Sequence, residues 1–440
     1  MGETDCGAGV LSDMNLDIYS ITLWMAVIWP LLLAVPALCS RLPWPRHLAL
    51  IPAMVLLILP GTASLELPWL LFGTGFAIDH NSRWILAMSI TIWLMAATME
   101  KTSNHNSSVN QANTFFMLTL AGNLGALLST DLVGFFSFSA LMGYGFYGLL
   151  IEGGNAQIRR AGRVYIIFLV LADLALFEAL LLAAYSTENL HYSSVRQAMP
   201  ATGSSQFYFW MAFTGFALKA GIWPVQLWLS ASYRSAAVSR TLLLAGVPVA
   251  MALLGALRWL GIGEPSLSMM GMPVQILGLV AMLYTALRLI THKSIRRIPE
   301  RLCMFGTGLF IAALGTGLAH PPLWHQYSYL VYPFIALWGI VLAVLVIMLA
   351  SFQDTHPEPD FTLQALKTLG ISAERWINMS GQWANNKRVS LQRFSLSLML
   401  KMVKQCQTIL DWPKLNHLVN GWSARITLLV LLGLAMAWLA

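Results

Sequence analysis

Charged residues are scarce in this 440-residue sequence, because only 10% are Asp, Glu, Lys or Arg while 57% are hydrophobic. The mean hydropathy is +0.66. A water-soluble core cannot enclose that much apolar surface. The composition therefore excludes a water-soluble catalytic domain and makes lipid the main solvent of the chain.

Clustered cysteines are also lacking. The four cysteines follow no CxxC or Cys/His spacing, so neither an iron–sulfur cluster nor a zinc site is indicated; they are Cys6, Cys39, Cys303 and Cys406. No nucleotide, haem or quinone motif is visible either. We therefore predict no cofactor and no metal, and a chain that is not an enzyme by itself, although it fits a subunit of an oxidoreductase-like or hydrogenase-like complex.

The N-terminus lacks the basic stretch of a cleaved signal. Residues 1–18 carry Glu3, Asp5, Asp13 and Asp17. We therefore expect the first apolar segment to stay in the protein, after a periplasmic N-terminal segment of residues 1–18.

Long apolar runs fill most of the remaining chain. Each has roughly the 20 residues that a helix needs to cross the hydrocarbon core of a bilayer. The sequence predicts an all-α integral membrane protein with about twelve spans, at 19–40, 48–72, 84–99, 112–129, 131–151, 164–186, 207–230, 239–260, 270–290, 302–319, 326–351 and 424–440.

The basic residues between these spans are distributed unequally. Thirteen lie on one side, Arg41, Arg46, Lys101, Arg159, Arg160, Arg163, Arg234, Arg240, Arg288, Lys293, Arg296, Arg297 and Arg301, and three on the other, Arg83, Arg196 and Arg258. Cytoplasmic loops carry the excess of Lys and Arg. The asymmetry predicts that both termini are periplasmic and that residues 19–354 form a bundle of eleven spans.

A basic segment, residues 355–422, precedes the last expected span, 423–440. Its stretch Leu391–Leu410 places apolar residues at helical spacing between lysines. We expect a cytoplasmic amphipathic helix along the membrane plane, held either by anionic lipid headgroups or by a neighbouring subunit.

Three ionisable residues lie deep inside expected spans, where a charge is costly unless it is paired or hydrated. Asp173 and Glu178 are in the sixth span and Lys219 is in the seventh. A carboxylate beside a buried lysine raises the proton affinity of the amine, and its removal lowers that affinity. The three residues are therefore candidates for a proton path, and a static ion pair that fixes helix register is the alternative.

Two prolines lie close to this lysine. Pro224 follows Lys219 by five residues, and Pro248 is inside the eighth span. Proline within a span frees backbone carbonyls, as in the broken helices that line transporter ion paths. A simple packing kink is the other interpretation.

Two stretches of this sequence are similar to the antiporter-like subunits of respiratory complex I, membrane-bound hydrogenases, Mrp cation/proton antiporters and inorganic-carbon uptake complexes. TFFMLTLAGNLGALLSTDLVGFFSFSALMGYGFYGLLI resembles the fourth and fifth spans, with Asp131 at the acidic turn. ALKAGIWPVQLWLSASYRSAAVSRTLLLAG resembles the seventh and eighth, and places Lys219 on the family's seventh-span lysine. The resemblance also places Asp173 on the sixth-span aspartate of the branch that contains the largest such subunit of complex I.

Other positions depart from that family. Ala140 stands where the fifth-span glutamate is expected, Ala250 replaces the eighth-span lysine of many members, and residues 230–233 read SASY where PDAH is usual. The family's later spans are also missing before the basic segment.

The resemblance leaves three functions open. The first is a proton-translocating subunit of a multi-subunit complex in the bacterial inner membrane, in which Asp173 or Glu178 replaces the missing glutamate beside Lys219. The second couples proton flow to inorganic-carbon uptake by a soluble carbon-hydrating partner, in place of a redox partner. The third is a structural docking subunit that does not conduct. All three imply other membrane subunits and lipids as partners, and no nucleic acid.

Overall fold

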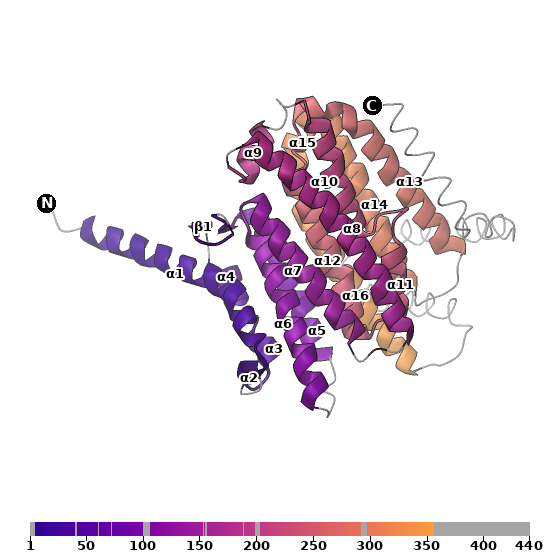
Figure 1. The fold of residues 1–440 in the computed structure, drawn as a ribbon, viewed down its shortest axis with the longest axis horizontal. Coiled ribbons are helices and arrows are strands. Elements are labelled where there is room, and N and C mark those ends of the chain that lie inside the picture. The colour runs from indigo at the N-terminus through magenta and orange to yellow at the C-terminus, as the bar shows by residue number, and fades with distance from the viewer. Residues whose placement is uncertain are drawn as a thin grey trace, which may run out of the picture.

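The computed structural model describes residues 5–39, 42–59, 61–71, 73–99, 106–152, 154, 156–187, 189–198, 203–291 and 297–355. The expected lateral helix (355–422) and last span (423–440) lie outside these residues apart from Thr355. The described part is mostly helical, and its helices run side by side in one bundle (Figure 1).

The first half of the bundle consists of α1 (Asp5–Leu33), α2 (Pro36–Cys39), α3 (Pro45–Leu48), α4 (Ile51–Ile58), a hairpin of β1 (Ala63–Glu66) and β2 (Gly75–Ile78), α5 (His80–Met99), α6 (Asn106–Leu128), α7 (Leu132–Ile151) and α8 (Ala156–Ser186). The second half consists of α9 (Tyr192–Ala198), α10 (Ser205–Ala220), α11 (Leu227–Ser235), α12 (Val238–Trp259), η2 (Pro265–Met270), α13 (Gly271–Thr291), α14 (Ile298–Ala319), α15 (Pro321–Tyr327), η4 (Ser328–Leu330) and α16 (Val331–Thr355).

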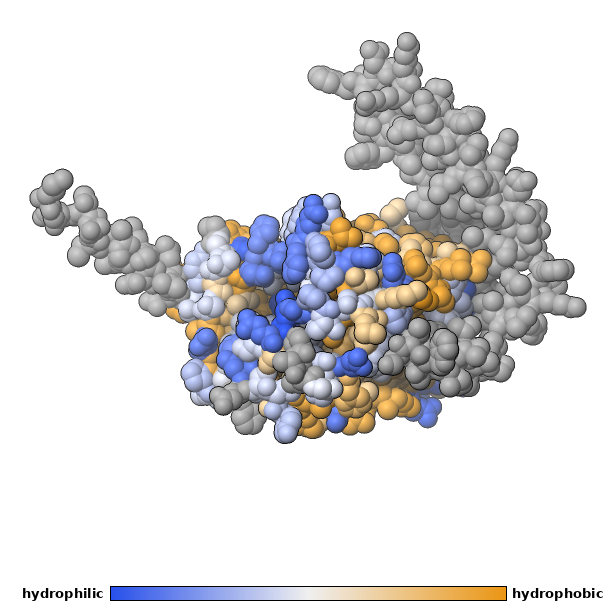
Figure 2. Space-filling model, turned by 90° about the horizontal axis from the view of Figure 1, so that it is seen from above, coloured by the Kyte–Doolittle hydropathy of each residue, from blue (hydrophilic) through white to orange (hydrophobic). Residues whose placement is uncertain are grey.

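Seven helical segments of the described chain are long and apolar enough to cross a membrane: His80–Met99, Leu132–Ile151, Ala156–Ser186, Val238–Trp259, Pro265–Leu289, Ile298–Ala319 and Pro321–Ala350. In the end view of Figure 2, hydrophilic residues gather at the centre of the face and hydrophobic ones follow its rim. An apolar flank with polar ends is the surface that a bilayer requires. The protein is therefore a multi-pass membrane protein.

The second expected span, 48–72, is wrong as a single helix. α4 ends at Ile58, and β1 and β2 then pair antiparallel, Ala63 opposite Ile78. The sequence continues as Pro60-Gly61, which disfavours a helix. Hydropathy alone did not distinguish this short helix and hairpin from a span, because both are rich in leucine.

The seventh expected span, 207–230, is interrupted. α10 ends at Ala220 because Gly221 adopts a left-handed conformation (φ 63°), and α11 begins only at Leu227. Pro224 lies in the non-helical segment between them. The predicted interruption at Pro248 is wrong, however, since α12 continues through this residue. Its helix is enclosed by neighbours over most of its length, and they hold it in place.

Close helix crossings depend on glycine at two points. A Cβ on Gly122 of α6 would lie 2.3 Å from the backbone nitrogen of Met142 in α7, and one on Gly278 of α13 would lie 2.3 Å from that of Ala312 in α14. Small residues allow helix backbones to approach closely in membranes, where packing replaces the hydrophobic effect. These crossings place α7 firmly against α6, and α7 forms one wall of the site.

Asp131 stabilises the start of α7. Its carboxylate accepts hydrogen bonds from the backbone of Gly134 at 2.7 Å and of Gly75 at 3.3 Å, and from the Thr74 hydroxyl at 3.3 Å. The acidic turn that resembles the family's is thus an N-cap that also holds the β-hairpin.

Asp131→Ala is expected to destabilise the protein by about 1–2 kcal/mol, the usual cost of losing an N-cap. The measurement is the apparent melting temperature of the purified chain in detergent at one scan rate. Asp131→Asn is the matched control, because asparagine caps helices as well as aspartate does. Equal melting temperatures for the alanine variant and the wild type would contradict this role.

Candidate functional site

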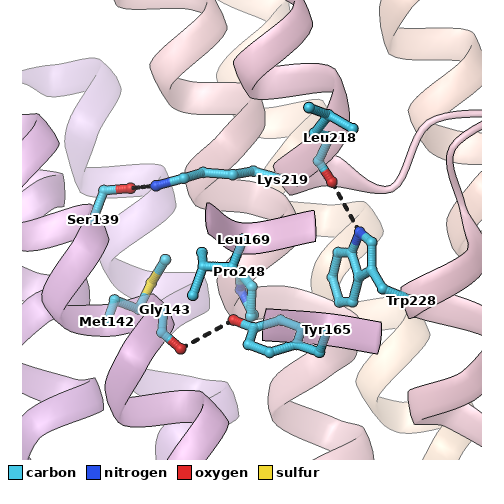
Figure 3. Close-up of a pocket in the computed structure, with 9 residues that line it drawn as sticks. All are labelled: Ser139, Met142, Gly143, Tyr165, Leu169, Leu218, Lys219, Trp228 and Pro248. Atoms are coloured by element: carbon cyan, nitrogen blue, oxygen red, sulfur yellow. Dashed lines mark hydrogen bonds between the residues drawn. The ribbon is translucent and has the colours of Figure 1, made fainter. Parts of the chain in front are cut away.

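A buried ion pair joins α8 and α10. The Lys219 ammonium lies 2.8 Å from Oδ1 of Asp173, and the two side chains are only 5% and 10% exposed. Lys219 Nζ also donates a hydrogen bond of 2.6 Å to the hydroxyl of Ser139 in α7. Figure 3 shows the lysine extended across the site toward this serine. Three helices therefore supply the immediate surroundings of one ammonium group.

Glu178 lies elsewhere. Asp173 is buried on α8, whereas Glu178 is exposed on the same helix. Five residues at 100° each turn the two side chains about 140° apart, so one helix cannot present both to Lys219. The structure brings together Lys219 and Asp173 and leaves Glu178 on the outer face of the bundle.

A small cavity of about 20 Å³ adjoins the ion pair, lined by Ser139, Met142, Gly143, Tyr165, Leu169, Leu218, Lys219, Trp228 and Pro248 (Figure 3). A cavity of this size holds about one water molecule. Its polar edges are occupied, since Tyr165 donates to the Gly143 carbonyl at 3.2 Å and Trp228 donates to the Leu218 carbonyl at 2.8 Å. The Trp228 bond also ties α11 back to the last turn of α10, across the interruption.

The two alanines that depart from the family lie beside this arrangement. Ala140 neighbours Ser139 in α7, so the serine hydroxyl contacts Lys219 from the turn where the family has its glutamate. Ala250 of α12 lines a second cavity of about 20 Å³, whose wall includes Cys303 and Thr307 but no carboxylate, amine or guanidinium. The site therefore has one ammonium group where many relatives have two.

A buried polar cluster between α11 and α14 was missed in the sequence. Ser230 donates to Oε1 of Glu300, and both Ser232 and Tyr233 are buried, although their SASY segment lacks the charges of PDAH. Gln226, at the start of α11, donates to the hydroxyl of Tyr284 at 3.4 Å. Glu300 lies among arginines in the sequence, which is typical of a solvated loop, so no local signal marked it as buried. The cluster extends from the interruption after Lys219 to the end of the bundle that carries most of the basic residues.

Two comparisons with known sequences identify this arrangement. Residues 129–299 match the family model described as NADH:quinone oxidoreductase/Mrp antiporter, transmembrane. The chain is 24% identical over 220 residues to hydrogenase-4 component B of Escherichia coli (strain K12), which covers 48% of this chain and 32% of that protein. It is 26% identical over 260 residues to a probable K(+)/H(+) antiporter protein of Rhizobium meliloti (strain 1021), covering 56% and 47%.

A solved structure shares the fold. The Mrp complex from Dietzia sp. DQ12-45-1b contains a chain that superposes with a TM-score of 0.60 at 19% identity, covering 76% of this chain and 64% of that one. The fold and the buried site thus define a helical membrane subunit of the antiporter type. Residues 129–299 belong to the NADH:quinone oxidoreductase/Mrp antiporter transmembrane family, so the predicted resemblance is confirmed. The chain spans only 32–47% of the length of the two sequence relatives above.

Proposed function

We propose that this chain moves or gates protons as an antiporter-like subunit of a multi-subunit complex, with Lys219 as the group that holds the proton. The observation that carries the proposal is the buried Lys219–Asp173 pair, beside a helix interruption and a cavity that holds about one water. A buried ammonium that has a single carboxylate partner responds strongly to any movement of that partner. When Asp173 moves away, the neutral amine is favoured and the proton leaves.

Asp173 takes the place of the missing fifth-span glutamate in this proposal, and Glu178 has no part in proton transfer. Access from the cytoplasm runs along the cluster of Gln226, Ser230 and Glu300, because its polar groups are buried and follow directly after the interruption at Pro224. The test is proton flux across vesicles that contain the reconstituted complex, with wild-type or Lys219-substituted chain. A flux that is independent of Lys219 would refute the proposal.

A non-conducting docking subunit is the second candidate. It is favoured by the cavity at Ala250, which offers no titratable amine or carboxylate where many relatives carry a lysine. The same flux measurement separates the two candidates. The subunits that co-purify with the chain distinguish a redox-driven complex from one coupled to inorganic-carbon uptake.

We further propose the complete topology of twelve spans in a bacterial inner membrane, with residues 355–422 as a cytoplasmic lateral helix and 423–440 as the last span. Two of the described contacts support the orientation. Arg240 pairs with Glu152 at 3.0 Å at the end rich in basic residues, whereas Arg258 and Arg83 donate to backbone carbonyls at the other end. Two of the three basic residues on the sparse side are thus used as helix caps.

Reporter fusions test this topology. Fusions after Arg163 and after Arg301 are expected to report the cytoplasm, and a fusion at the C-terminus is expected to report the periplasm, because the basic loops stay inside. A fusion before α5, at Asp79, is the control for the periplasmic side. A cytoplasmic C-terminus would refute the last span.

A further inference from the structure

One face of α8 carries a continuous exposed apolar stripe. Its exposed residues recur at intervals of three and four positions: Ile167, Val170, Leu171, Leu174, Phe177, Leu181 and Tyr185. This spacing aligns side chains along one side of a helix. α8 packs with its other side against α7, α10 and α11. The stripe alone is what a lipid-facing helix would show.

Glu178 interrupts this stripe. It is exposed and falls between Leu174 and Leu181, at the spacing of the stripe itself. The helix continues for another eight residues to Ser186, which at 1.5 Å per residue places Glu178 about 12 Å from the helix end. The carboxylate therefore lies within the hydrocarbon layer, where an ionised side chain against lipid is strongly disfavoured and faces a partner instead.

We propose that the stripe of α8 is the docking site for a spanning helix of another membrane subunit, which presents a lysine or arginine to Glu178. Charge complementarity selects this occupant. A second copy of this chain is disfavoured, because a two-fold axis along the membrane normal would bring the two Glu178 carboxylates to the same depth, facing each other.

The chain's own C-terminal segment fits less well. Its basic residues between 360 and 421 belong to a segment expected at the membrane surface, and the last expected span has its single basic residue, Arg425, in its first turn. Neither reaches the depth of Glu178. The proposal goes beyond the proposed function and does not depend on proton conduction, since it concerns assembly.

A photo-crosslinking residue at Leu174, one turn from Glu178 and 64% exposed, tests the proposal in native membranes with the complex intact. The expected product joins Leu174 to a spanning peptide of another subunit that contains a lysine or arginine. The same probe at Leu283, 63% exposed on α13, is the matched control. Products at Leu174 with lipid only, with this chain's own residues 356–440, with a second copy, or with a peptide without a basic residue would each overturn the proposal.

Charge reversal then tests the ion pair directly. Glu178→Lys is expected to lower the crosslink at Leu174 and the co-purified subunit by about tenfold or more, because a buried charge loses its partner. The products at Leu283 should not change. Changing the mapped basic residue to glutamate in the Glu178→Lys background is expected to restore assembly. If the exchanged pair fails to restore it, the proposal is wrong, whatever the proton flux.

Discussion

Lys219→Ala is expected to abolish the proton-coupled activity of the complex while assembly stays intact. The substitution removes the ammonium from a site where Asp173 lies 2.8 Å away and Ser139 2.6 Å away. An unpaired buried carboxylate is costly, so Asp173 is expected to take up a proton and stay neutral. The site then has no group that gains and loses a proton during turnover. Proton flux into vesicles, normalised to the amount of assembled complex, is the measurement.

Lys219→Arg is the control that separates proton transfer from a static ion pair. Arginine keeps the positive charge and its attraction to Asp173, but a guanidinium does not deprotonate in proteins. A register-fixing pair would therefore work with arginine, whereas a proton carrier would fail. Asp173→Asn is expected to be inactive as well, because it leaves the ammonium without its carboxylate.

A stability control removes both charges at once. Breaking a buried pair by removing one partner costs roughly 3–5 kcal/mol, whereas replacing both by apolar residues is often neutral. Lys219→Met with Asp173→Leu should therefore restore the melting temperature that either single substitution lowers, without restoring flux. If Lys219→Ala assembles and the complex works at the wild-type rate, the docking-subunit function should replace the conducting one.

Arg258→Ala is expected to be among the most destabilising single substitutions in the described chain. The Arg258 guanidinium donates to the carbonyls of Ala126 (3.1 Å), Leu127 (2.7 Å) and Ser129 (3.3 Å), and to the Ser82 hydroxyl (3.1 Å). The last carbonyls of a helix have no partner within that helix, so α6 depends on this side chain.

Further contacts of Arg258 add to this cost. The guanidinium lies 5.4 Å from the ring centre of Tyr192, a favourable cation–π arrangement. The Tyr192 hydroxyl is 3.1 Å from that of Ser129, and burial raises the pKa of Tyr192 to about 12, so the phenol stays neutral at physiological pH. Since each buried acceptor left unsatisfied costs about 1–3 kcal/mol, the total loss is expected to be about 3 kcal/mol or more.

The apparent melting temperature in detergent measures this loss. Arg196→Ala is the matched control, because Arg196 is exposed on the same side of the bundle, and a surface substitution changes stability by no more than about 0.5 kcal/mol. Arg258→Lys should give an intermediate value, since an ammonium reaches fewer of the carbonyls. Equal melting temperatures for Arg258→Ala and Arg196→Ala would contradict the capping role.

The choice between Asp173 and Glu178 illustrates how sequence and structure divide the information. Their spacing of five residues already implies that only one of them faces Lys219, because helical geometry is local. Which one does so depends on the rotation of α8 about its axis. Packing against α7, α10 and α11 sets that rotation, so it is a property of the whole bundle.

The second expected span and the Glu300 cluster show the same limit. A window of apolar residues predicts burial in lipid, but it does not distinguish a spanning helix from the short α4 followed by a hairpin that packs on Asp131. Likewise, an acidic residue in a basic loop gives no local sign that a serine seventy positions earlier donates a hydrogen bond to it. Both depend on contacts between distant parts of the chain.

By itself, the sequence determined that this is a multi-pass helical membrane protein, that it resembles the antiporter-like subunits, and that a lysine and two carboxylates lie inside its spans. These features follow from hydrophobic length, loop charge and local order, all of which can be read along the chain. Only the tertiary structure decided that Asp173 pairs with Lys219, that Glu178 faces outward and that Arg258 caps α6. The physical reason is that a buried charge is stabilised by atoms from other helices, whose positions are set only when the helices pack together.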